Sequence, residues 1–211
     1  RHVENVVRLL DEGNTIPFIA RYRKELHGAM DDTSLRTLEE RLQYLRGLEE
    51  RREAVKKSID EQGKLTDELA AAIDSAKTLA EVEDLYRPYK QKRRTRATMA
   101  KEKGLEPLAV LLFAQERSCP RPEDAARDFV DSERGVESVE DALQGASDII
   151  AEQISDDAAI RKSLRALISR QGRLVSRAAT EDDSVYRLYY DFTQSVAHLQ
   201  GHQVLAINRG E

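Results

Sequence analysis

Residues 35–63 read LRTLEERLQYLRGLEERREAVKKSIDEQG, and this stretch decides the fold. Its apolar residues recur at steps of three and four, which is the spacing of one face of an α-helix. They are Leu35, Leu38, Leu42, Leu45, Leu48, Val55 and Ile59. Glutamate and arginine fill the other faces, as is typical of a helix surface in contact with water. The pattern predicts one helix of about thirty residues, roughly 45 Å long, that ends at Gly63.

The same helical spacing continues on both sides of this stretch. Shorter helices are predicted near residues 3–10, 17–26, 66–76, 78–87, 96–103, 107–113 and 125–130, and a second long one is predicted from residue 138 to residue 168. The apolar stripe of that second helix slips out of phase at Ser155–Asp157, which predicts a break or a sharp bend there. The strand period of two dominates nowhere, and the tail from His202 onward fits either a short helix or a strand. The prediction is an all-α fold, a multi-helix bundle of about ten helices with one or two long ones.

Composition narrows the class of protein further. The chain has 211 residues, of which 35% are charged and 5% aromatic. A chain of this length can bury roughly 70% of the surface that its unfolded form exposes. The single cysteine, Cys119, excludes an internal disulfide and indicates a reducing, cytoplasmic location. No apolar run approaches the ~18 residues that a membrane span needs. The chain opens at Arg1 in a helical pattern and without methionine, which predicts a piece of a longer protein.

Two prolines within residues 116–122 mark the best candidate for a linker. The predicted division is an N-terminal helical subdomain at residues 1–115, which contains a basic loop, and a second helical subdomain at residues 123–211. One continuous all-α unit is the alternative.

A basic tract stands out from the acidic background of the chain, whose formal net charge is −5. Residues 86–96 read YRPYKQKRRTR, and the cations of this tract are Lys90, Lys92, Arg93, Arg94 and Arg96. Clustered cations beside aromatic rings suit a phosphate backbone and exposed bases. The candidate nucleic-acid site consists of these five cations and Tyr89, which would stack on a base. Two alternatives stay open, namely a solvated loop whose charge is offset by Glu81, Glu83 and Asp84, and a contact for a protein partner.

A second basic group, Arg21-Tyr-Arg-Lys24, has a simpler interpretation. Its helical spacing directs Ile19 and Tyr22 to the core and Arg21 and Lys24 outward, so we expect core packing with a solvated edge.

Signs of catalysis or metal binding are weak. His198 and His202 have the i,i+4 spacing of a metal-binding helix, but no glutamate follows the first histidine, so the zinc protease pattern fails. Cys119 has no evident base partner, and the glycine-rich phosphate loops of nucleotide-binding enzymes are missing. We therefore expect no enzyme activity, no metal, no cofactor and no small-molecule substrate.

Four motifs resemble a known family. They are residues 15–25 (TIPFIARYRKE), 38–52 (LEERLQYLRGLEERR), 83–96 (EDLYRPYKQKRRTR) and 104–108 (GLEPL). In this order they are similar to the N-terminal region of the bacterial transcription accessory proteins of the Tex-like family. The likeness continues through residues 143–152 to the closing Arg-Gly-Glu211.

The resemblance implies more than composition does. Tex-like proteins are multidomain nucleic-acid binders with a helical N-terminal part that includes a helix-turn-helix-like element. A nuclease-like fold without activity, helix-hairpin-helix motifs and an RNA-binding barrel follow it. We expect this chain to be a non-catalytic helical scaffold that binds RNA or DNA. The alternative is a protein-interaction module, in which the long helix and an aromatic cluster at residues 186–192 dock other domains or the transcription machinery.

Overall fold

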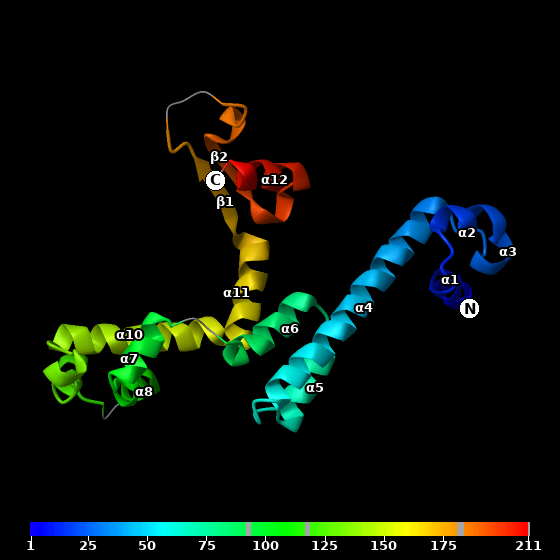
Figure 1. Ribbon diagram of the computed structural model, residues 1–211. Helices are drawn as coiled ribbons and strands as arrows, with labels where there is room; N and C mark the ends of the chain where they lie inside the picture. The colour runs from blue at the N-terminus through cyan, green and yellow to red at the C-terminus, as the bar shows by residue number, and fades with distance from the viewer. Residues whose placement is uncertain (92–93, 117–118, 181–183, 211) are drawn as a thin grey trace. The chain divides into compact units, whose positions relative to one another are not determined.

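The computed structural model describes residues 1–91, 94–116, 119–180 and 184–210 (Figure 1). Within these ranges the chain forms twelve α-helices and one two-stranded sheet, so the all-α prediction is confirmed. The chain divides into two compact units, Arg1–Tyr89 and Lys90–Glu211. None of the described helices is long and apolar enough to cross a membrane.

The first unit is built on the predicted long helix. It contains α1 (His2–Asp11), α2 (Ile16–Tyr22), α3 (Lys24–His27), α4 (Asp32–Asp60), α5 (Asp67–Ser75) and α6 (Leu79–Tyr86). The long helix α4 has 29 residues and begins where the carboxylate of Asp31 accepts a hydrogen bond from the backbone N–H of Ser34, 2.8 Å away. Such an N-cap satisfies one of the amide groups that an isolated helix start leaves without a partner.

Two separate cores share α4, one at each end (Figure 1). At its start Leu35 packs with Val6 and Ile19 of α1 and α2. Toward its end Val55 and Ile59 pack with Ile73 of α5, in a cluster that also holds Leu48 and Val82. One side of the helix near its middle is open, because Leu45 is 44% exposed and a Cβ added to Gly47 would meet nothing within 4 Å, although Leu48 beside them is buried in the second core.

The second unit has one core, assembled on α10 (Val139–Asp156). The helices α7 (Arg96–Glu102), α8 (Glu106–Ala114) and α9 (Pro122–Arg127) pack against it. Ala142, Ala146 and Ile149 of α10 meet Leu105 and Leu108 in this core. Gly145 makes the close approach possible, because a Cβ at this position would collide with the side chain of Leu105 and lie 3.3 Å from the Cβ of Ala100.

The predicted break in the second long helix is confirmed. The helix α10 ends at Asp156, and α11 (Ala158–Gln171) begins with Asp157 as its N-cap. The carboxylate of Asp157 accepts a hydrogen bond from the backbone N–H of Ile160, 2.7 Å away. The out-of-phase stripe is thus two helices, each with its own cap.

A β-hairpin follows α11, and the sequence pattern did not predict it. The strands β1 (Arg173–Arg177) and β2 (Asp191–Ser195) pair antiparallel, with Arg173 opposite Ser195 and Arg177 opposite Asp191. Each strand has five residues, too few for a period of two to emerge from one sequence. The tail forms α12 (Gly201–Arg209), which settles the choice between helix and strand. The predicted linker at residues 116–122 includes two residues outside the described ranges, and the predicted domain division stays a prediction.

Candidate nucleic-acid interface

The basic tract lies between a 3-10 turn, η1 (Arg87–Tyr89), and α7. Lys90, Arg94 and Arg96 are exposed. Lys92 and Arg93 lie outside the described residues. Thr95 forms the N-cap of α7, because its hydroxyl accepts a hydrogen bond from the backbone N–H of Thr98 at 3.1 Å. This cap fixes the backbone beside Arg94 and Arg96, so the described end of the tract joins an ordered helix.

One carboxylate contacts the described part of the tract. The guanidinium of Arg94 lies 2.6 Å from a carboxylate oxygen of Glu102, and the two side chains are 67% and 53% exposed. An exposed pair of this kind contributes only about 0–1 kcal/mol, so a phosphate group can displace the carboxylate. Of the acids that the offset-charge alternative invokes, Glu83 pairs with Arg51, Glu81 accepts a hydrogen bond from the backbone N–H of Lys77, and Asp84 is buried, so this alternative stays open.

The two tyrosines ahead of the cations pack into the first unit. Tyr86 lies with its hydroxyl 3.0 Å from that of Ser58 and its ring under the guanidinium of Arg51, 5.3 Å from the ring centroid. Tyr89 is half-buried against the core cluster at the end of α4, and its carbonyl accepts a hydrogen bond from the side-chain amide of Gln62. Stacking of Tyr89 on a base, which stays a prediction, therefore has only the open part of this ring to use.

The second basic group differs from its expected arrangement. Ile19 is fully buried, and Arg21 and Lys24 are exposed, as expected. The expectation that Tyr22 faces the core was wrong, because this side chain is 56% exposed. Tyr22 is the last residue of α2, whereas the pattern predicted a helix that continues to about residue 26, so helical spacing does not determine what covers this side chain.

Rings and guanidinium groups lie close together on α2. The ring centroids of Phe18 and Tyr22 are 5.3 Å apart. The guanidinium of Arg23 lies 5.0 Å from the Phe18 centroid, and that of Arg21 lies 6.0 Å from the Tyr22 centroid. Helical spacing alone could have found the pairing of Phe18 with Tyr22, since they are four residues apart. The exposure of the pair could not be found in this way.

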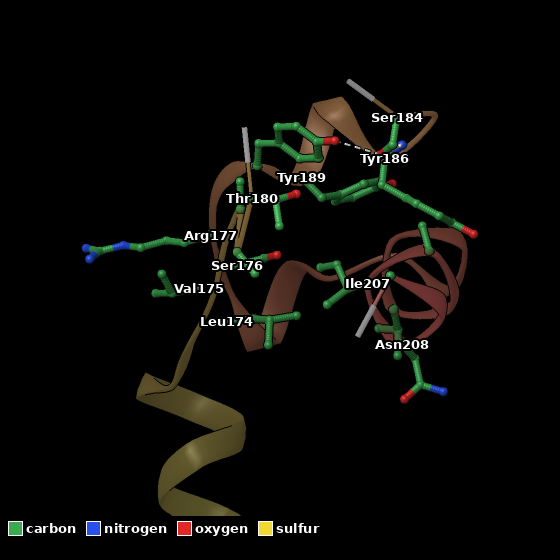
Figure 2. Close-up of a pocket in the computed structure, with 16 residues that line it drawn as sticks. Leu174, Val175, Ser176, Arg177, Thr180, Ser184, Tyr186, Tyr189, Ile207 and Asn208 are labelled. Carbon is green, nitrogen blue, oxygen red and sulfur yellow. Dashed lines mark hydrogen bonds between the residues drawn. The ribbon is translucent and has the colours of Figure 1, made fainter. Parts of the chain in front are cut away.

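A cavity of about 780 Å³ opens between β1, the turn η3 (Arg187–Tyr189) and α12 (Figure 2). Leu174 of β1 and Ile207 of α12 point into it from opposite sides, whereas Val175 and Arg177 point away. Tyr186 and Tyr189 form another wall. The predicted aromatic cluster is present here in part, since the rings of Tyr189 and Phe192 have centroids 5.4 Å apart.

The region around this cavity has no buried side chain. From Ile150 to Gly210 every described residue is exposed or half-buried. On α11 the apolar residues at i, i+4, i+7 and i+8 form a stripe whose exposed fractions run from 37% to 54%. The members of this stripe are Ile160, Leu164, Leu167 and Ile168. A stripe of this width normally faces a protein core.

Metal binding gains no support from the positions of the histidines. His198 ends the 3-10 turn η4 (Val196–His198), whereas His202 belongs to α12, so the two do not share a helix. Within the described ranges no group of three or more His, Cys, Asp or Glu side chains could hold a metal ion. Cys119 is half-buried, with its sulfur 3.9 Å from the carbonyl oxygen of Leu111.

Comparison with known proteins gives two family matches. Residues 1–60 match the family described as Tex-like protein N-terminal domain, and residues 118–211 match Tex central region-like. The chain is 48% identical over 217 residues to the uncharacterized protein YdcI of Bacillus subtilis, covering 100% of this chain and 30% of the relative. It is 44% identical to the transcriptional accessory protein Tex of Neisseria gonorrhoeae, with 99% and 27% covered.

A more distant relative is S1 RNA-binding domain-containing protein 1 of Homo sapiens, which is 31% identical over 217 residues, with 98% of this chain and 21% of the relative covered. The chain therefore spans between a fifth and a third of the length of these relatives.

Proposed function

Because the chain belongs to the Tex-like family of transcription accessory proteins, we propose that it is a non-catalytic helical scaffold that binds RNA or DNA through the basic tract. The residues assigned to this site are Lys90, Lys92, Arg93, Arg94, Arg96 and Tyr89. The observation that carries the proposal is the exposure of Lys90, Arg94 and Arg96 on an otherwise acidic chain. The names of two relatives, which refer to transcription and to an RNA-binding domain, agree with it.

The binding mechanism is electrostatic. Each cation that meets a phosphate releases a condensed counterion, so affinity falls as salt rises. Arginine suits this role because its planar guanidinium forms two parallel hydrogen bonds to phosphate. If about four phosphates of a single strand are neutralised, the logarithm of the affinity falls with the logarithm of the salt concentration with a slope of roughly −3.

Fluorescence anisotropy with labelled RNA and DNA at several salt concentrations tests the proposal. The double variant Arg93→Glu, Arg94→Glu should weaken binding to both and make the salt slope shallower. The matched control is Lys57→Glu, Lys64→Glu, which changes the net charge equally at two exposed positions of the first unit. An equal loss of affinity in both variants would mean that net charge alone explains the effect. Unchanged affinity in the tract variant would show that the tract is not part of the binding site.

A second candidate function is docking of another part of the longer protein onto residues 157–210. The observation that favours it is the combination of the exposed α11 stripe and the cavity beside α12, in a stretch where none of the described residues is buried. Exposed apolar patches of this kind mark interaction surfaces. We also propose that the chain contacts the transcription machinery, that it is located in the cytoplasm and that its helices include a helix-turn-helix-like element.

Association in solution tests the docking function. The remainder of a Tex-like relative, produced as a separate polypeptide, should bind this chain after nuclease treatment. Leu164→Asp should abolish that binding, whereas Ser163→Asp, one residue away and outside the stripe, should leave it unchanged. Binding that disappears with nuclease would point to nucleic-acid bridging instead.

A further inference from the structure

We propose that Phe18 and Tyr22 form a stacking platform for the bases of a single-stranded nucleic acid, with Arg21 and Lys24 in contact with its phosphates. This site is separate from the basic tract. The inference rests on the proposed function in one respect, because it names the form of nucleic acid that the chain binds. Its residues all lie in the first unit and within the described ranges.

The two rings lie side by side. Phe18 and Tyr22 are four residues apart on α2, so they share a face of the helix, and their planes are tilted by 49° at a centroid separation of 5.3 Å. More than half of Tyr22 is open to solvent. The guanidinium of Arg21 lies 6.0 Å from the Tyr22 centroid, so a cation stands beside the open part of this ring, on which a nucleobase can stack.

Cations surround the rings without acidic partners. Arg21 and Lys24 are exposed, and neither forms an ion pair with an acid among the residues that the structure describes. Arg23 is half-buried, lies over Phe18 and donates a hydrogen bond to the carbonyl of Tyr22 at 3.0 Å, so it supports the platform from one side.

Most arginines of α4, in the same unit, form ion pairs, unlike Arg21. Four of those on α4 pair with carboxylates, at N–O distances between 2.5 and 2.7 Å. They are Arg36, Arg46, Arg51 and Arg52. The unit therefore has carboxylates within reach of most of its α4 guanidinium groups but places none against those of α2. Unpaired cations beside the exposed ring of Tyr22 and the half-buried ring of Phe18 fit a ligand that brings both negative charge and flat π-faces.

The platform is held rigidly. Ile16 and Ile19 anchor α2 in the core with 3% and 0% of their surface exposed, and Pro17 sets the first turn of the helix. A ligand that binds here does not need to order the rings. A duplex hides the faces of its bases within the stack, and an acidic peptide has charge without a flat face, so a single strand fits this surface best.

The experiment compares two ligands of equal charge on the whole 211-residue chain. One is a labelled dodecamer of deoxythymidine, and the other is an abasic deoxyribose-phosphate strand of the same length. The chain should prefer the strand with bases by about fivefold or more, which is the effect expected from one stacked base. Tyr22→Ala should remove this preference and leave affinity for the abasic strand unchanged, and Tyr22→Phe should keep it.

Substitutions in the basic tract should instead change the affinity for both strands. Lys90→Glu with Arg94→Glu should weaken both ligands equally and keep the preference for bases. If Tyr22→Ala binds the thymidine strand as tightly as the unaltered chain does, the platform proposal is overturned. The basic-tract proposal is not affected by that result, because the Lys90→Glu, Arg94→Glu variant tests it separately. If the unaltered chain binds neither strand, both proposals fall.

Cross-linking provides a measurement that needs no variant. Irradiation of the unaltered chain with a 5-iododeoxyuridine strand, followed by peptide mapping, should mark the peptide that contains Phe18 and Tyr22. Cross-links confined to other peptides overturn the site. A decaglutamate peptide that binds more tightly than the thymidine strand, and loses this affinity in Tyr22→Ala, overturns the choice of ligand.

Discussion

Two glycines inside long helices should respond in opposite ways to the same substitution. Gly47 lies on an open side of the middle of α4, and Gly145 lies in the packed middle of α10. Neither has a positive φ, so alanine fits the backbone at both. Alanine is favoured over glycine in a helix interior by about 0.8–1.0 kcal/mol. This gain is the whole expectation for Gly47→Ala, because an added Cβ meets nothing within 4 Å.

The same gain at Gly145 meets a steric cost. The new Cβ would collide with Leu105, which is 1% exposed and fixed in the core, and would press on Ala100. Overpacking of this kind costs about 1–3 kcal/mol. The change in local opening free energy should therefore be about 1–3 kcal/mol less favourable for Gly145→Ala than for Gly47→Ala.

Native-state hydrogen exchange read by mass spectrometry measures both effects, because it reports local opening free energies peptide by peptide. Peptides from α4 should exchange about fourfold to fivefold more slowly in Gly47→Ala. Peptides from α10 should show no slowing, or faster exchange, in Gly145→Ala. Equal slowing in both variants would refute the close contact of Gly145 with Leu105, and faster exchange in Gly47→Ala would refute a continuous α4.

Three further substitutions have defined outcomes. His27 is 1% exposed with neither ring nitrogen hydrogen-bonded among the described residues, so His27→Leu should keep or raise the free energy of unfolding, whereas His27→Asn should lower it, as urea titration would show. Asp157→Ala should lower the stability of α11 by about 0.5–2 kcal/mol, visible as faster amide exchange in residues 158–162 but not in α10. Hydrogen bonds from the side chain and backbone of Ser34 lower the pKa of Asp31 below its ordinary value of 3.8. The ionised cap therefore stabilises α4 above pH 3.8, and this stabilisation is lost as the pH falls through the lower folded-state pKa. In thermal melts recorded at a series of pH values, Asp31→Asn should make the melting temperature fall less steeply toward acid pH.

Local signals made most of the fold predictable. The break at Asp157 was visible because an N-cap and a phase slip occur within a few neighbouring residues. The length of α4 was visible because its apolar stripe repeats over about seven turns, from Leu35 to Ile59. The pairing of β1 with β2 was not visible, because it joins residues as far apart as Arg173 and Ser195 through two short strands. Contacts across the chain of this kind leave no periodicity in either strand.

In the candidate sites, too, local sequence signals predicted some features, whereas features that depend on contacts between segments were not predictable. Charge density revealed the basic tract, but the pairing of Arg94 with Glu102 depends on the direction in which α7 leaves the tract. Helical spacing assigned Tyr22 to the core, since the periodic rule assumes a covering layer along the whole helix. Burial depends on neighbours from other segments, which the spacing within α2 does not reveal, and Tyr22 is 56% exposed.

The stretch from Ile150 to Gly210 shows how folding and docking are linked in this chain. Fixing the backbone of each residue costs about 1–2 kcal/mol in conformational entropy, and burial of apolar side chains is the main term that offsets it. No described residue in this stretch is buried, although α11 carries a continuous apolar stripe and the cavity beside α12 has apolar walls. The helix and hairpin therefore leave apolar surface open to solvent. A partner that covers the stripe would supply the missing burial, so binding of that partner and ordering of these elements should be one equilibrium.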